Sequence, residues 1–298
     1  MVKSTNHYLE IGSSHDDCQD FAISGMVNPN LAYAILCDGC SASHEMCREV
    51  DFGARLIAYA ARKVIMKEYK GTIALTEAIP DNMIHTLLTD SAAMAEQQRE
   101  LFALHPSAID ATLLICLSDG NRHNVLMFGD GGFVYKRKGE KELNFINVEF
   151  ESGAPYYPSY SLNAGRMDAY NLSFGKPYEV RQHSYKIRED GTVDKRDVAL
   201  TPSYNNWFYK QTNHTIEGEL AFIALTSDGV KSFQRPHKDY PEITQHLEPE
   251  QVVPLMFGYK NLNGQFVERR MKMFKKDTKE EQWSHYDDVS VSAISFSN

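Results

Sequence analysis

YAILCDG, residues 33–39, is an apolar run that stops at an Asp-Gly pair. The same arrangement returns in NVLMFGDG at 124–131 and in FIALTSDG at 222–229. In DDVSVSAISF at 287–296 the order is reversed, and two aspartates precede the apolar run. Apolar runs of this length with β-branched residues are typical of buried strands. The sequence therefore predicts four core strands, each with an acidic residue at one end.

The aspartates at these strand ends are Asp38, Asp130, Asp228 and Asp287. A carboxylate at the point where a strand leaves the core is rigidly held and half exposed, so it can meet its equivalents from other strands. Any one of them alone is better explained as a turn residue, because Asp-Gly is a common turn. Four carboxylates that converge at one end of a sheet form an oxygen-rich site that suits hard divalent cations. We therefore expect a metal-dependent hydrolase.

Size and charge limit the class of protein. The chain has 298 residues and a formal net charge of −9, which would repel nucleic acid and acidic membrane surfaces. No stretch approaches the roughly 20 apolar residues that span a bilayer, and the N-terminus lacks the apolar core of a signal peptide. Five cysteines, an odd number, do not indicate a disulfide framework. We expect a cytoplasmic protein that binds neither nucleic acid nor membranes. Nothing marks an oligomer interface, so we expect a monomer.

The apolar periodicity predicts an α+β protein. The expected strands are 20–26, 31–37, 111–117, 123–128, 133–136, 144–148 and 289–296, and the expected helices are 45–69, 81–101, 249–258 and 265–275. Strands on both sides of a helical pair, with hairpin-length links, favour antiparallel sheets covered by helices. The sequence shows no internal repeat and no linker, so we expect a single domain over residues 1–298.

Residues 151–218 differ from the rest of the chain. They are rich in Tyr, Ser, Asn, Gly and Pro and have weak periodicity, with candidate strands only at 178–185 and 197–200. A polar, aromatic excursion between two metal-ligand strands can form a rim or lid over a site. A surface loop with no catalytic role explains the same composition equally well.

Five separated blocks occur in order along the chain. They are HDDCQD at 15–20, DG at 38–39, GDG at 129–131, TSDG at 226–229 and DDVSV at 287–291, and DATL at 110–113 resembles a sixth. Each block alone is a weak signal, but their order and spacing resemble the metal-dependent protein phosphatases of the type 2C family, most closely a bacterial subgroup. The resemblance implies a four-layer α-β-β-α sandwich, with two antiparallel sheets face to face, helices outside and metals at one end.

The resemblance also implies an activity and roles for particular residues. The activity is hydrolysis of phosphoserine and phosphothreonine in phosphorylated proteins. Asp38 would bridge two Mn²⁺ or Mg²⁺ ions, with the Gly39 carbonyl as a further ligand, and Asp228 and Asp287 would complete the shell of the first ion. Asp130 would pair with Asp228 to hold a weaker third ion.

Asp20 would act beside the bridging ligand. The chemistry is reasonable without the resemblance, because two ions supply a bridging hydroxide at neutral pH and clamp the phosphoryl oxygens. Carboxylates, carbonyls and waters suit Mg²⁺ and Mn²⁺, whereas Zn²⁺ usually takes imidazole or thiolate ligands.

Three residues depart from the family pattern. Gln19 stands where many members have a glutamate ligand, which predicts weakened metal affinity. His15 stands where the family usually has a phosphate-binding arginine, and it lacks the bidentate fork of Arg. Phosphate contact and a structural hydrogen-bonding role are equally compatible with His15, and Arg48 or Arg166 are alternative cations for the phosphate.

Cys40 replaces a histidine that is proposed as general acid in eukaryotic members. A metal-bound water or His44 could protonate the leaving oxygen instead. A thiol at this position, if exposed beside the metals, would also be open to oxidation.

Two other functions are compatible with parts of the sequence. A phosphatase-like scaffold that binds phosphoproteins without turnover would explain His15 and Gln19, although such a scaffold has no need to keep every metal carboxylate. A zinc or redox module would use Cys18, Cys37, Cys40 and Cys47, but no second Cys-x-x-Cys pair follows. We expect a phosphatase that acts through a metal-bridging hydroxide.

Overall fold

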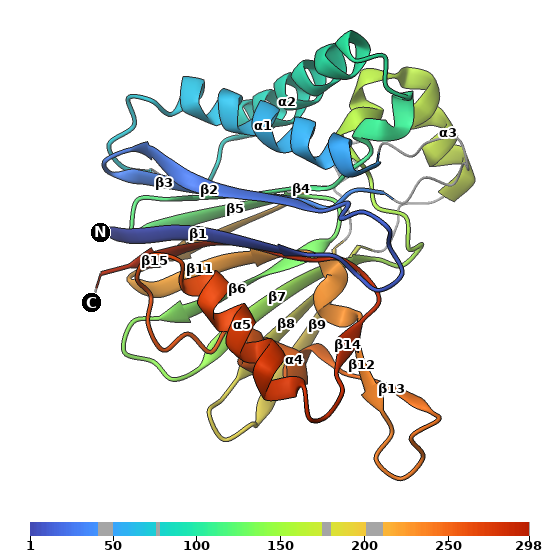
Figure 1. Cartoon of the computed structure of the whole chain (residues 1–298). Helices are drawn as coiled ribbons and strands as arrows, with labels where there is room; N and C mark the ends of the chain where they lie inside the picture. Colours follow the sequence, from blue (N-terminus) through green and yellow to red (C-terminus); the bar gives the residue numbers. More distant parts are fainter. Residues whose placement is uncertain (41–49, 76–77, 175–179, 201–210, 298) are drawn as a thin grey trace.

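The structure is a computed structural model that describes residues 1–40, 50–75, 78–174, 180–200 and 211–297. Two antiparallel sheets lie face to face, and helices cover the outer side of each sheet (Figure 1). The predicted α-β-β-α sandwich is confirmed. The predicted single domain stays a prediction.

The larger sheet has seven strands and the smaller has five. The larger sheet contains, in spatial order, β1 (Val2–Glu10), β15 (Val289–Phe296), β11 (Leu220–Thr226), β6 (Gly131–Arg137), β7 (Leu143–Phe150), β8 (Val180–Ile187) and β9 (Val193–Leu200). The smaller sheet contains β10 (Gln211–Glu217), β5 (Arg122–Phe128), β4 (Leu113–Ser118), β3 (Leu31–Cys37) and β2 (Phe21–Asn28). A separate three-stranded sheet is made by β13 (Thr244–His246), β12 (Phe233–Pro236) and β14 (Ser284–His285).

Helices α1 (Val50–Glu68) and α2 (Asp81–Leu101) cover the smaller sheet, and α4 (Pro249–Met256) and α5 (Phe266–Thr278) cover the larger one (Figure 1). α3 (Ala164–Phe174) lies at one end of the sandwich. Short 3₁₀ turns are η1 (Pro106–Ile109), η2 (Pro158–Leu162) and η3 (Asp228–Lys231).

Strand β3 explains why these layers stack as they do. Every residue of β3 is buried, and successive side chains point to opposite faces. Tyr33 and Ile35 pack with α1 and α2, whereas Ala34 and Leu36 pack between the two sheets. A strand that is apolar on both faces must lie inside the molecule, so β3 fixes the centre of the sandwich.

Most predicted elements are present. The candidate strands of the excursion, 178–185 and 197–200, overlap β8 and β9 of the larger sheet, and residues 211–217 form β10 of the smaller one, so the excursion is not only a loop. β1 was not predicted from the sequence; it pairs with β15 along the edge of the larger sheet. The part of the predicted first helix before Val50 lies outside the described residues.

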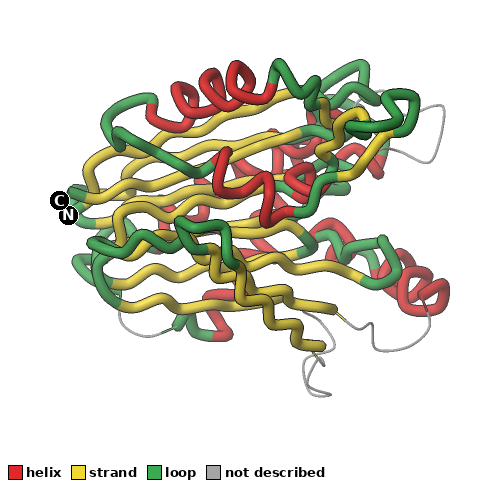
Figure 2. Tube along the Cα trace, turned by 90° about the horizontal axis from the view of Figure 1, so that it is seen from below, coloured by secondary structure: helices red, strands yellow, loops and turns green. Residues whose placement is uncertain are grey.

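The two ends of the sandwich are different. The termini meet at one end, where the amide of Ser297 donates to the carbonyl of Met1 at 3.0 Å, and Figures 1 and 2 show both termini there. The opposite end is where β3 and β11 finish and where β15 starts, and it collects the acidic residues that follow or precede these strands.

Candidate metal centre

Asp38 is held by backbone pairing just beyond β3. Its amide donates to the Thr112 hydroxyl at 2.9 Å, and the Thr112 amide donates to the Asp38 carbonyl at 2.8 Å. Gly39 forms an isolated antiparallel bridge with Ala111, and the bonds on either side of it come from Thr112 and Cys40. In this pattern the carbonyl of Gly39 points away from Ala111. It therefore remains available as the ligand that the sequence predicts.

Asp228 and Asp287 come together because β11 and β15 are neighbours. The amide of Ser227 donates to the carbonyl of Ser290 at 3.2 Å, so the chain leaving β11 passes the chain entering β15. A Cβ on Gly229 would lie 1.8 Å from the Asp288 carbonyl oxygen. Only glycine allows this approach, which explains the Asp-Gly pair at this position.

Asp130 lies in the turn between β5 and β6. The glycines on either side of it, Gly129 and Gly131, have φ of +97° and +119°, which L side chains rarely adopt. A Cβ on Gly131 would also lie 3.1 Å from the Thr226 carbonyl oxygen, at the end of β11. The GDG sequence therefore brings Asp130 next to the strand that precedes Asp228.

Asp20 precedes β2 and is almost fully buried, with 1% of its surface exposed. Its Oδ2 atom has no hydrogen-bond partner among the described residues. Burial raises the pKa of Asp20 well above its usual value, and Asp288 adds to this effect. A buried carboxylate oxygen without a donor is costly unless a cation or a proton compensates it.

The carboxylates influence one another strongly. Asp38 interacts electrostatically with Asp20, Asp228 and Asp130. Burial raises the pKa of Asp38 well above its usual value, and the charges of Asp20, Asp228 and Asp130 raise it further. Burial also raises the pKa of Asp130, to about 7, with Asp228 as the next cause, and that of Asp287. The structure therefore brings all five predicted carboxylates to one end of the sandwich, where they repel one another.

Hard divalent cations fit this set of groups. Each ion would offset the repulsion between carboxylates. Within the described ranges, no group of three or more His, Cys, Asp or Glu side chains is arranged to hold one ion. Mg²⁺ keeps several waters and takes only one or two carboxylates, so the arrangement suits hydrated ions better than an ion enclosed by protein. Coordination by the named residues stays a prediction.

Asp288 organises the loop that carries His15 and Gln19, a role that the sequence did not reveal. Its carboxylate accepts from the amides of Gly12 at 2.7 Å and Gln19 at 2.6 Å, and it is 2% exposed. Nδ1 of His15 lies 3.1 Å from Asp288 Oδ2, and Nε2 lies 3.8 Å from Asp287 Oδ1. His15 thus lies against both aspartates of the Asp-Asp pair. The Asp-Asp pair is visible in the sequence, but the sequence does not show that Asp288 is the member that binds the loop.

The excursion contributes Tyr157 to the rim of the centre. The Tyr157 hydroxyl hydrogen-bonds with the Cys40 thiol, and its electrostatic neighbours include Asp38 and Asp130. Burial raises the pKa of both groups. Half-buried and bonded in this way, Cys40 is not the exposed thiol that the sequence had suggested.

Arg166 fastens the excursion to the sandwich. Its guanidinium lies 2.6 Å from Asp110, which also accepts from the Ser159 hydroxyl at 2.6 Å. Arg166 is therefore already paired and is a poor candidate for the phosphate-binding cation. Arg48 and His44, the other residues considered for phosphate binding and proton donation, lie outside the described residues.

The cysteines among the described residues do not come together as the alternative zinc site. Cys37 is fully buried in β3, where it packs with α1 and α2, and Cys18 and Cys40 are half-buried. Cys47 lies outside the described residues. The absence of a three-ligand group in the described part of the chain applies to thiolates as well.

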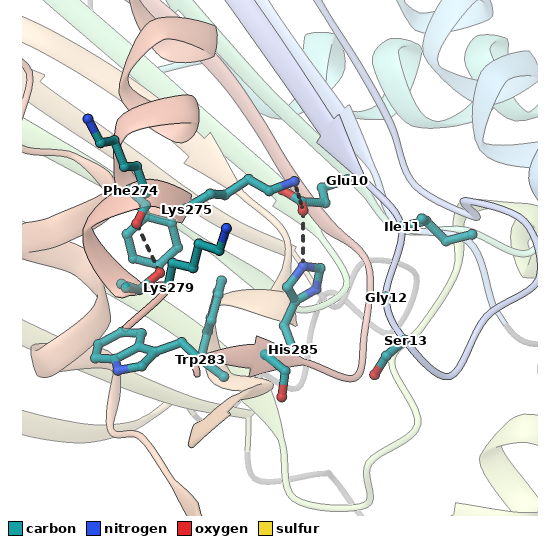
Figure 3. A pocket seen from close by; sticks show the side chains of 13 residues that line it. Glu10, Ile11, Gly12, Ser13, Phe274, Lys275, Lys279, Trp283 and His285 are labelled. Atoms are coloured by element: carbon teal, nitrogen blue, oxygen red, sulfur yellow. Dashed lines mark hydrogen bonds and ion pairs between the residues drawn. The ribbon is translucent and has the colours of Figure 1, made fainter. Parts of the chain in front are cut away.

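A separate cavity of about 750 Å³ opens beside the centre (Figure 3). Phe274, Trp283 and His285 line it, together with Lys275 and Lys279, among others. Glu10, the only carboxylate among its described lining residues, is paired with Lys275 and with His285 at 3.6 Å. These residues therefore do not offer a set of carboxylates to a metal ion.

Comparison with known proteins agrees with the geometry. Residues 12–152 match the family described as protein phosphatase 2C. The serine/threonine phosphatase Stp1 from Staphylococcus aureus has a similar structure, with a TM-score of 0.53 and 11% identity over 100% of this chain and 96% of that one. The Mycobacterium tuberculosis serine/threonine phosphatase PstP/Ppp gives a TM-score of 0.52 and 16% identity over 100% of both chains. No curated protein matches the sequence.

Proposed function

We propose that this chain removes phosphate from phosphoserine and phosphothreonine in proteins with the help of Mn²⁺ or Mg²⁺. Two findings support a phosphatase of this type: the match to the protein phosphatase 2C family over residues 12–152, and the fold, which resembles that of bacterial serine/threonine phosphatases over the whole chain. The observation that carries the proposal is the convergence of Asp38, Asp130, Asp228 and Asp287, with Asp20 behind them, at one end of the sandwich.

The carboxylates hold the ions in the proposed reaction. Asp38 interacts electrostatically with Asp20, Asp228 and Asp130, so it is the residue best placed to serve two ions at once. When bound, a pair of divalent ions would lower the pKa of bound water and offset the charge of the phosphoryl oxygens. Carboxylates bind metal in their ionised form, so affinity should increase with pH. Oxygen ligands favour Mn²⁺ or Mg²⁺ over Zn²⁺.

His15 and Tyr157 face the centre from two sides. When protonated, His15 provides a positive charge beside Asp287, where it can orient a phosphoryl group or the carboxylate itself. Tyr157, near Asp38 and Asp130, gives the rim an aromatic surface that a substrate side chain would meet. This arrangement favours the rim role for the excursion over the passive loop.

The setting in the cell is also a proposal. No helix in the described part of the chain is long and apolar enough to cross a membrane. We propose a cytoplasmic, monomeric enzyme whose partners are phosphorylated proteins. The net charge of −9 argues against nucleic acid and membranes as partners.

The test is hydrolysis of p-nitrophenyl phosphate and of a phosphothreonine peptide with Mn²⁺, with Mg²⁺ or with EDTA. Turnover that needs metal and disappears in Asp228→Asn would support the proposal, because the substitution removes a ligand charge but keeps the shape. Metal binding without turnover of either substrate would contradict it and would favour the scaffold. Turnover that is unaffected by EDTA would contradict the metal mechanism.

A further inference from the structure

Lys231 places a positive charge inside the acidic centre. It is the last residue of η3, three positions after Asp228. In a 3₁₀ turn, side chains three positions apart eclipse one another, so Lys231 and Asp228 project to the same side. Only 29% of the Lys231 side chain is exposed. A lysine that is mostly withdrawn from water beside acidic groups needs an explanation.

One carboxylate forms an ion pair with the ammonium group, and two more interact with it electrostatically. Nζ of Lys231 lies 3.3 Å from Oε1 of Glu149, and its other electrostatic partners are Asp228 and Asp130. Burial by itself would lower the pKa of Lys231, but the three carboxylates outweigh it and raise the pKa. Lysine is normally cationic, and the Lys231 ammonium opposes the rise in the pKa of Asp130.

Glu149 is itself held in place from the neighbouring strand positions. It accepts from the Asn147 amide at 2.6 Å, and Nε2 of His183 lies 3.6 Å from its other oxygen. Asn147 is fully buried on β7. These contacts keep Glu149 at the edge of the centre, and Glu149 in turn keeps the ammonium of Lys231 beside Asp130 and Asp228.

The sequence predicted that Asp130 and Asp228 hold a third ion. We propose instead that the Lys231 ammonium takes the place of that ion, so that the chain works with two divalent ions and one built-in cation. The inference rests on the proposed function in one respect, since it takes Asp228 to be a metal ligand. An ammonium group offsets the repulsion between the two aspartates, but it offers no vacant coordination position and it repels an incoming divalent ion.

The test counts bound Mn²⁺ by equilibrium dialysis at millimolar Mn²⁺ and about pH 8, because metal binding displaces protons from the carboxylates and is favoured by a higher pH. We expect two ions in the wild type and in Lys231→Arg, which keeps the charge. Lys231→Gln should bind three ions, and adding Asp130→Asn to it should return the number to two. Asp130→Asn alone should leave the wild-type number unchanged, and this variant does not depend on tolerance of a change at Lys231.

Three ions in the wild type, with a loss of one in Asp130→Asn, would overturn the inference. Two ions in Lys231→Gln would also overturn it, provided that circular dichroism shows the variant to be folded. Phosphatase assays on the same samples separate the two proposals. Two ions without turnover would support the role of Lys231 and contradict the proposed function, whereas three ions with turnover would do the reverse. No bound metal would contradict both.

Discussion

Two Asp-Gly turns lie at opposite ends of β5, and their aspartates have different surroundings. At the end near the termini, Asp119 accepts from the amides of Asn121, Arg122 and Leu75, each at 2.8 Å. Burial opposes ionisation of Asp119, but these amides outweigh it and lower its pKa. At the other end, burial and Asp228 raise the pKa of Asp130 to about 7.

The difference shows what separates a structural aspartate from a functional one. Asp119 finds its donors within its own turn and in one nearby loop, so it stabilises the fold. Asp130 faces other carboxylates across the sandwich and is poorly compensated by protein groups other than Lys231. Perturbed carboxylates without local donors are typical of functional sites. The environment of Asp130 therefore supports the proposal of a functional site at this end of the sandwich.

The largest expected effect is on catalysis. Asp38→Asn should lower kcat/KM for a phosphothreonine peptide by about 1000-fold or more, equivalent to about 4 kcal/mol of transition-state stabilisation. Asp119→Asn, the matched control at the other end, should leave kcat/KM unchanged. Steady-state kinetics with Mn²⁺ would measure both variants. A similar loss in both, or in neither, would mean that the two ends of the sandwich do not differ in function.

The second largest effect is on the free energy of unfolding and compares one glycine at each end of the sandwich. Gly229→Ala should lower the free energy of unfolding by more than about 3 kcal/mol, because its Cβ would lie 1.8 Å from the Asp288 carbonyl oxygen. Gly120→Ala, at φ of +94° with its nearest neighbour 3.3 Å away, should cost only about 1–2 kcal/mol. Urea denaturation would give both values. Equal losses would show that the close approach at Gly229 does not set its cost.

A smaller effect should have opposite signs in the two turns. In metal-free protein at about pH 8, Asp119→Asn should destabilise the fold by about 1–2 kcal/mol, because the carboxylate that three amides bind is lost. Asp130→Asn should stabilise it by about the same amount, because it removes a buried charge. Thermal melts in EDTA would measure both changes. Destabilisation by Asp130→Asn would mean that Asp130 is well compensated in the fold.

The smallest effect is the pH dependence of that stabilisation. The pKa of Asp130 is about 7 in the fold against 3.8 for the ordinary group, so between these values the folded chain holds a proton that the unfolded chain has released. The stability that this proton provides is complete at low pH and is lost as the pH rises through about 7. The advantage of Asp130→Asn over the wild type should therefore shrink from about pH 8 to about pH 5. If the difference in stability between Asp130→Asn and the wild type does not change with pH, it has a cause other than the ionisation of Asp130.

The sequence was informative where function depends on strand ends. An apolar run followed by an aspartate is a local pattern, so Asp38, Asp130 and Asp228 could be identified, and the order of the blocks indicated the sandwich. The sequence does not show contacts between distant segments. Nothing near Lys231 in the sequence indicates that Glu149 and Asp130 interact with it.

The excursion shows a second limit. β9 is an edge strand of the larger sheet and most of its residues are exposed. Its sequence therefore has few apolar residues and shows only a weak period of two. β1 has the same edge character and a polar composition, and it was missed for the same reason. Edge strands gain their stability from pairing with a partner strand, which no local pattern reports.

The central claim is that the acidic end of the sandwich is a metal centre. The most direct measurement is anomalous diffraction from crystals grown with Mn²⁺ at about pH 8, because metal binding releases protons and is favoured by a higher pH. We predict two anomalous peaks that share Asp38 as a ligand, with Lys231 beside Asp130 and no third peak. Strong peaks elsewhere, or no peak within bonding distance of Asp38, would contradict the account.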